Sequence, residues 1–281
     1  MDLENKPFLG GILIFVSALS FALMTFAIKA WGKDSLVPSY EYAFFRFLLG
    51  FLCVSTFFLI KKKKPSPKKK FWLFIRGASN GGAVILLFAS LTLTTLTKAN
   101  MLNMTYPVWV AILSPFLLKE KISRIQVFAL FVGFIGIWLV LDPNISHIEK
   151  GDLVALLSGI VMGIAVASLR KVRMTEDAET TLFWLFGIGV LMTIPFFPLF
   201  VIPKGIGILA LFFAPFFGVV GQISINAGMK YIKGFTGAII STARLVIAGV
   251  LGVAFLGEDL KFSLFLGGIF IILSIVMAAK G

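Results

Sequence analysis

Two arginines, Arg46 and Arg244, lie inside long apolar runs, where a charged side chain is a candidate for chemistry. An arginine at the centre of a membrane-spanning helix costs at least about 2.5–3.5 kcal/mol on insertion scales, so it rarely faces lipid. Arg244 lies near the middle of its run, and its planar fork of donors suits a carboxylate or a phosphate. Water and helix-end carbonyls are the structural alternative. Arg46 lies nearer the expected outer face, where Glu41 is a candidate partner.

Uncharged polar side chains in the same kind of apolar run extend this candidate site. Asn103 and Tyr106 are three residues apart, so they share one face of a helix. Pro107 follows them and frees a backbone carbonyl nearby. Hydrogen bonds between helices explain such residues equally well. The further substrate-binding candidates are Asn80, Gln222, Asn226 and Trp184. The ring of Trp184 could stack on a planar substrate, and packing between helices is the alternative.

The residues needed for catalysis are scarce. The one histidine, His147, lies in a loop, and all 13 acidic residues lie in loops or at the ends of apolar runs. Hydrolysis needs a nucleophile with a base, and metal-dependent chemistry needs clustered ligands. We therefore predict no enzyme, no metal and no cofactor. A relay of intramembrane acids is also missing, which favours uniport or exchange over proton coupling. Glu120 and Glu258 are expected to close a turn or a helix end.

The elements that hold these residues are apolar helices. Hydrophobic residues make up 59% of the chain, charged residues 14%, and the mean hydropathy is +1.00. Soluble domains have about 25% charged residues, so the bilayer must be the solvent for most of this chain. A spanning helix needs about 20 apolar residues, and Thr92 to Thr97 give the weakest boundary between runs. The ten expected spans are 8–30, 40–60, 71–93, 97–118, 122–141, 152–169, 180–202, 205–229, 235–256 and 262–279.

The positive charges predict the orientation. With a cytoplasmic N-terminus, the inner segments hold 17 Lys and Arg residues and the outer segments hold 6. This bias places both termini in the cytoplasm. The same rule explains the net charge of +13 without nucleic acid. The seven lysines between Lys61 and Lys70 are expected to anchor this topology, and anionic lipid could bind them as well.

The chain repeats itself weakly. With an offset of 141 residues, Ser17 meets Ser158 and Lys29 meets Arg170; with an offset of 138, Glu120 meets Glu258. These matches divide the chain into halves, 1–141 and 142–281, of five spans each. An odd number of spans gives the halves opposite orientations. Inverted repeats of this kind are used by many secondary transporters for alternating access, although some channels have them too.

The whole chain resembles the EamA family of the drug/metabolite transporter superfamily. The resemblance rests on the order of weak motifs at the end of each half, together with an Arg early in the second span, here Arg46. The family often has Pro in the ninth span, where this chain has Leu245. The motif residues are Ala99, Tyr106-Pro107-Val108, Leu118-Lys119-Glu120-Lys121, Gln126, Gly133 and Gly136 in the first half, and Leu256-Gly257-Glu258, Gly267 and Gly268 in the second.

The resemblance implies an all-α integral membrane protein with ten transmembrane helices in two five-helix inverted-topology repeats, located in an inner, or plasma, membrane. It implies transport of a small metabolite, such as an amino acid or a related carboxylate. Some relatives carry nucleotide-like metabolites such as S-adenosylmethionine, which is the alternative substrate class, and a channel is the less favoured alternative. The expected partners are the small-molecule substrate and the lipid bilayer, with a monomer or a homodimer as the assembly.

Overall fold

A computed structural model of the protein describes residues 6–32, 37–106, 108–110, 112–113, 124–141, 148–173, 175–203, 205–228, 231, 240–241, 243–259 and 261–280. The described elements are helices. Their bounds are α1 (Lys6–Gly32), α2 (Ser39–Ile60), α3 (Lys70–Leu93), α4 (Leu96–Asn103), α6 (Arg124–Leu141), α7 (Lys150–Arg173), α8 (Ala178–Thr193), the 3₁₀ helix η3 (Ile194–Leu199), α9 (Gly207–Gly228), α11 (Ala243–Leu256) and α12 (Phe262–Lys280).

Six of the helical segments are long and apolar enough to cross a membrane, and they coincide with expected spans to within a few residues. Three shorter apolar helices lie in α6, α11 and α12. The expected spans 97–118 and 235–256 fall partly outside the described residues, so the count of ten stays a prediction. The six long segments are Phe8–Trp31, Ser39–Ile60, Lys70–Leu93, Lys150–Leu169, Ala178–Leu199 and Gly207–Gly228.

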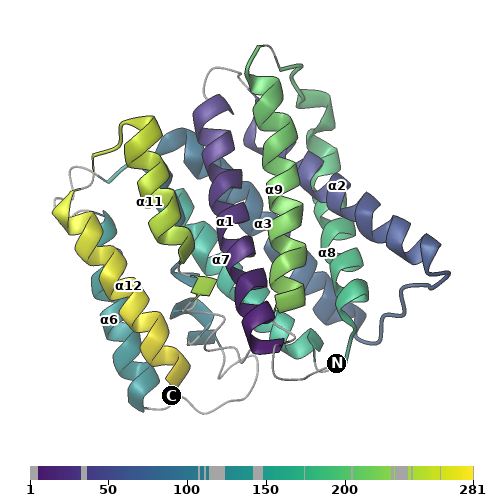
Figure 1. Cartoon of the computed structure of the whole chain (residues 1–281), viewed down its shortest axis with the longest axis horizontal. Helices are drawn as coiled ribbons and strands as arrows, with labels where there is room; N and C mark the ends of the chain where they lie inside the picture. Colours follow the sequence, from purple (N-terminus) through teal and green to yellow (C-terminus); the bar gives the residue numbers. More distant parts are fainter. Residues whose placement is uncertain are drawn as a thin grey trace.

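The helices pack side by side in one bundle (Figure 1). The α6–α12 pair forms one end of the bundle and α2 with α8 forms the other, while α1, α3, α7 and α9 lie between them. The most extensive contacts join α1 to α9, α3 to α7, and α6 to α12. The first turn of α1 and the last turn of α12 lie at the same edge of the bundle in this view.

Small residues let some of these helices approach closely. A side chain at Gly136 of α6 would meet the backbone nitrogen of Ile271 on α12 at 2.9 Å. Gly159 of α7 lets α4 approach closely, because a side chain at this position would meet the Leu102 carbonyl oxygen at 2.6 Å. Gly163 of α7 lies in the same way against the chain that follows α4. Such spaced small residues are a common packing device in membranes.

The outward faces of the helices are apolar. On α6, the exposed side chains Phe128, Phe131, Ile135 and Trp138 recur every three or four residues and form one stripe. A water-soluble monomer rarely exposes apolar patches of this size. Together with the apolar spans, this stripe describes a multi-pass membrane protein whose helix bundle faces lipid.

The boundary between α3 and α4 is a sharp break at Thr94 and Thr95. The Thr95 side chain accepts a hydrogen bond from the Lys98 amide and so caps α4. Glu258, which follows α11, accepts hydrogen bonds from the amides of Leu96 and Thr97 and from the Thr97 hydroxyl. The expected helix-end role of Glu258 is confirmed, since an anion is favourable at a helix N-terminus. Glu120 lies outside the described residues.

Candidate functional site

Arg244 is 8% exposed and projects from α11 toward α4. Its Nε donates to Asn100 Oδ1 at 2.9 Å, and its Nη1 makes a longer contact of 3.4 Å with Asn103 Oδ1. Its Nη2 donates to no atom of the described residues. Arg244 and Asn103, which the sequence analysis placed in one candidate site, are therefore neighbours, and one guanidinium nitrogen is buried without a partner among the described residues.

Asn100 is one of two residues of this site that the sequence analysis missed. It is fully buried, and its amide group joins three helices. The oxygen accepts from Arg244, and the amide nitrogen donates to the Leu96 carbonyl at 2.9 Å and to the Thr25 hydroxyl of α1 at 3.1 Å. Asn100 and Asn103 are three residues apart, which is the spacing that places two side chains on one helix face. That spacing was the available signal.

Arg46 of α2 is 3% exposed and reaches the same region. Its Nη2 makes a long contact of 3.5 Å with Gln222 Oε1 on α9, and its Nε has no partner among the described residues. Gly218 of α9 makes room for this side chain, because a Cβ there would meet Arg46 Nε at 2.7 Å. The structure thus brings Arg46 and Gln222, two candidates selected separately from the sequence, into one long contact, and Arg46 Nε stays unpaired among the described residues.

The suggested partnership of Arg46 with Glu41 is wrong. Glu41 is buried, and its carboxylate accepts the Val201 amide at 3.0 Å. The two residues are five positions apart on α2, and five steps of about 100° turn a helix side chain by about 140° relative to the first. Glu41 therefore faces the chain after η3, while Arg46 faces α9.

Arg76 of α3 is a third buried arginine, 4% exposed, which the sequence analysis did not select. Both its Nε and its Nη1 lack partners among the described residues. Asn80, which the sequence analysis selected as a substrate-binding candidate, lies one turn further along α3. Its Nδ2 makes only a 3.8 Å contact with Met162 Sδ, and its Oδ1 has no described partner.

We call the three buried arginines Arg46, Arg76 and Arg244 the arginine cluster, and Tyr106 is half-buried just after α4. A shared aromatic ring joins two of the three arginines directly. The guanidinium carbons of Arg46 and Arg244 lie 5.8 Å and 5.6 Å from the centre of one ring, that of Phe21.

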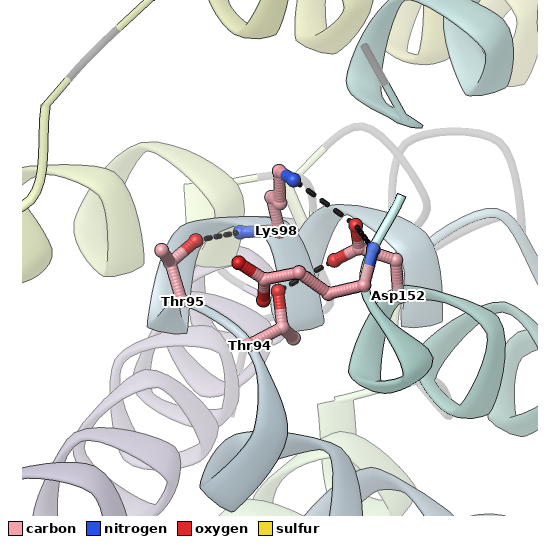
Figure 2. A network of polar contacts seen from close by, with 5 residues as sticks. Thr94, Thr95, Lys98 and Asp152 are labelled. Atoms are coloured by element: carbon pink, nitrogen blue, oxygen red, sulfur yellow. Dashed lines mark hydrogen bonds and ion pairs between the residues drawn. The ribbon is translucent and has the colours of Figure 1, made fainter. Parts of the chain in front are cut away.

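No acidic side chain in the described part of the chain neutralises the arginine cluster. The ion pair found among the described residues joins Lys98 to Asp152 at 3.0 Å. It lies at the α3–α4 break and not in the arginine cluster (Figure 2). Asp152 also accepts from the Thr94 hydroxyl, and Lys29 donates to the carbonyls of Leu91 and Thr94. These polar groups join the ends of α1, α3, α4 and α7, and they are nearly satisfied by one another.

Two other selected residues do not join the arginine cluster. Trp184 is half-buried on α8, and none of the ring contacts among the described residues includes it. Asn226 donates to the Gln222 carbonyl one turn earlier on α9. Pro107 lies outside the described residues. Within the described residues, no three of His, Cys, Asp and Glu gather as metal ligands would.

A bundle of apolar helices around buried, partly unpaired polar side chains is the architecture of a membrane transporter. The chain belongs to the EamA-like transporter family, whose sequence model matches residues 8–142 and again residues 149–279. The resemblance inferred from the motifs is therefore confirmed.

Individual relatives are also transporters by name. The chain is 28% identical over 280 residues to an uncharacterized transporter of Helicobacter pylori, covering 93% of this chain and 92% of that protein. It is 25% identical to mouse solute carrier family 35 member G1, covering 90% and 74%. It is 22% identical to the pseudopaline exporter CntI of Pseudomonas aeruginosa, covering 66% and 65%. A crystal structure with 17% identity superposes with a TM-score of 0.68 over 96% of both chains, which shows the fold.

Proposed function

We propose that the protein is a secondary transporter that moves a small carboxylate-bearing metabolite across the membrane by alternating access. The observation that carries the proposal is Arg244, a buried cation with a free donor and no acidic partner in the described residues. A substrate carboxylate supplies the missing anion. The amides of Asn100 and Asn103 hold the guanidinium in place, so its remaining donor is oriented before substrate arrives.

Alternating access requires two halves that can exchange roles. We propose the halves 1–141 and 142–281, and the helix packing supports them. Exchanging each helix for its counterpart five spans away turns the α1–α9 contact into α7–α3, and the α2–α9 contact into α8–α3. The pairs α2–α8, α4–α11 and α6–α12 map onto themselves. Inverted repeats of five spans predict this symmetry.

A nucleotide-like metabolite such as S-adenosylmethionine is the alternative substrate class. S-adenosylmethionine carries a sulfonium and an ammonium beside its one carboxylate. The three buried guanidinium groups of the arginine cluster would repel both cations. The charge of the site therefore favours a carboxylate-bearing solute, and CntI is a relative named as an exporter of pseudopaline.

Counterflow in proteoliposomes tests the proposal. Vesicles preloaded with unlabelled carboxylate should accumulate the labelled carboxylate transiently above equilibrium, with saturable kinetics. A channel would equilibrate the label without this overshoot. Vesicles containing the Arg244→Gln variant serve as the matched control, and the absence of counterflow for every carboxylate in a panel of amino acids and small organic acids would reject the proposed function.

We also propose that both termini and the loop at 61–70 face the cytoplasm at the inner, or plasma, membrane. In a Cys53→Ala background, a cysteine placed at the exposed Ser66 should resist an impermeant thiol reagent in intact cells and react once the cells are opened. Labelling of that cysteine in intact cells would overturn the orientation.

A further inference from the structure

We infer that the substrate is a compact dianion, with two carboxylates or a phosphate monoester, rather than a monocarboxylate or a zwitterionic amino acid. The inference rests on the proposed function, and it narrows the substrate class of the same site. It is carried by the number of unpaired guanidinium donors in the arginine cluster, not by Arg244 alone.

The donors fall into two groups. Arg244 is held by Asn100 and Asn103 and keeps Nη2 free. Arg46 Nε, Arg76 Nε and Arg76 Nη1 have no partner among the described residues, although Arg46 and Arg76 are 3% and 4% exposed. Buried polar groups normally find hydrogen-bond partners, and those that do not call for an explanation. A second anionic group on the substrate would supply the acceptors for Arg46 and Arg76.

Charge balance points the same way. All acidic residues of the chain lie in loops or at span ends, so the cluster's three positive charges have no counter-charge from the middle of the spans. A monocarboxylate would leave two of these charges uncompensated in a region of low dielectric, where unpaired charge is costly. A zwitterionic amino acid would add an ammonium to the same region and give no net compensation.

The spacing of the arginines limits the size of the substrate. Arg46 and Arg244 both lie over the ring of Phe21, so their guanidinium carbons are no farther apart than the sum of the two distances, 5.8 Å and 5.6 Å, to its centre. A substrate that contacts both arginines must therefore place its two anionic groups within this span.

A series of matched probes tests this inference at constant ionic strength. Succinate carries two negative charges, succinamate has the same length with one, and succinamide has none. Glycerol 3-phosphate provides a dianion of the other chemistry. We expect succinate or glycerol 3-phosphate to raise the Tm of the purified protein and to exchange in proteoliposomes at least about tenfold better than succinamate, because one anionic group would lose its arginine partners.

Variants separate the inference from the proposed function. Arg76→Gln and Arg46→Gln should each shrink the preference for the dianion over succinamate, whereas Arg124→Gln, which removes an exposed charge on α6, should leave it unchanged. Equal exchange of succinate and succinamate, both abolished by Arg244→Gln, would overturn the dianion and keep the carboxylate transporter. Exchange of none of the anionic probes or of any other carboxylate would overturn both.

Discussion

Substrate exchange by the Arg244→Gln variant is expected to fall by at least about thirtyfold in kcat/KM, which corresponds to about 2 kcal/mol. Arg244 combines burial, a strong bond to Asn100 and a free Nη2. Glutamine removes the charge and the fork of donors together, so a bound carboxylate would lose its charged partner on α11. The measurement is counterflow in proteoliposomes, normalised to the amount of inserted protein.

The Arg244→Lys variant separates the effect of the positive charge from the effect of the planar guanidinium group. Lysine keeps the charge but cannot bridge the Asn100 oxygen and a substrate oxygen with one planar group. We expect it to retain more exchange than Arg244→Gln and less than the native protein. Arg124→Gln is the control for loss of one positive charge at an exposed position. Native affinity and rate in a folded, inserted Arg244→Gln protein would assign this arginine to helix packing alone.

The sequence predicted the candidate site best where burying a charged side chain in the membrane costs the most free energy. A charged side chain in the middle of an apolar run rarely faces lipid, so Arg244 could be selected from its position alone. Asn103 was then selected as a polar residue on a candidate partner helix. Asn100 escaped because it lies only a few residues inside the expected span 97–118, where polar residues are common. Its importance comes from contacts with Thr25 and Arg244, which lie far away in sequence.

Arg76 escaped for a related reason. It is the sixth residue of the expected span 71–93, a depth from which an arginine can extend toward the interface. Its 4% exposure and its two unpaired nitrogens become visible only when α7 and α8 are packed against α3. The six long spans, in contrast, needed only local composition, and their bounds were predicted to within a few residues.

The arginine cluster and the network at the α3–α4 break show two ways of treating buried charge. At the break, Asp152 accepts from Lys98 and Thr94, and Glu258 accepts from the first amides of α4. In the cluster, positive charges lie together with free donors. The first arrangement stabilises the fold without a ligand. The second is unfavourable without a ligand, because buried charges and donors lack partners, and this agrees with the anion site proposed above.

Replacing Arg76 by Met is therefore expected to stabilise the ligand-free protein while impairing its function. The substitution removes a buried cation with two unpaired nitrogens and replaces it with an apolar side chain of similar length. Replacement of buried ion pairs by well-packed apolar side chains can stabilise by about 1–4 kcal/mol, and an unpaired cation lacks even the partner that offsets its loss of hydration. A stabilisation of about 1 kcal/mol corresponds to a rise of roughly 2 °C in Tm for a chain of this size. In detergent and without ligand, Arg76→Met should melt at least about 2 °C above the native protein. The control variant Arg124→Gln should melt at the same temperature as the native protein.

The stabilisation of the native protein by succinate or glycerol 3-phosphate should largely disappear in Arg76→Met, because the second anionic group loses its donors. A drop in the Tm of ligand-free Arg76→Met, with the ligand-induced shift retained, would show that Arg76 holds the helices together and does not bind the anion.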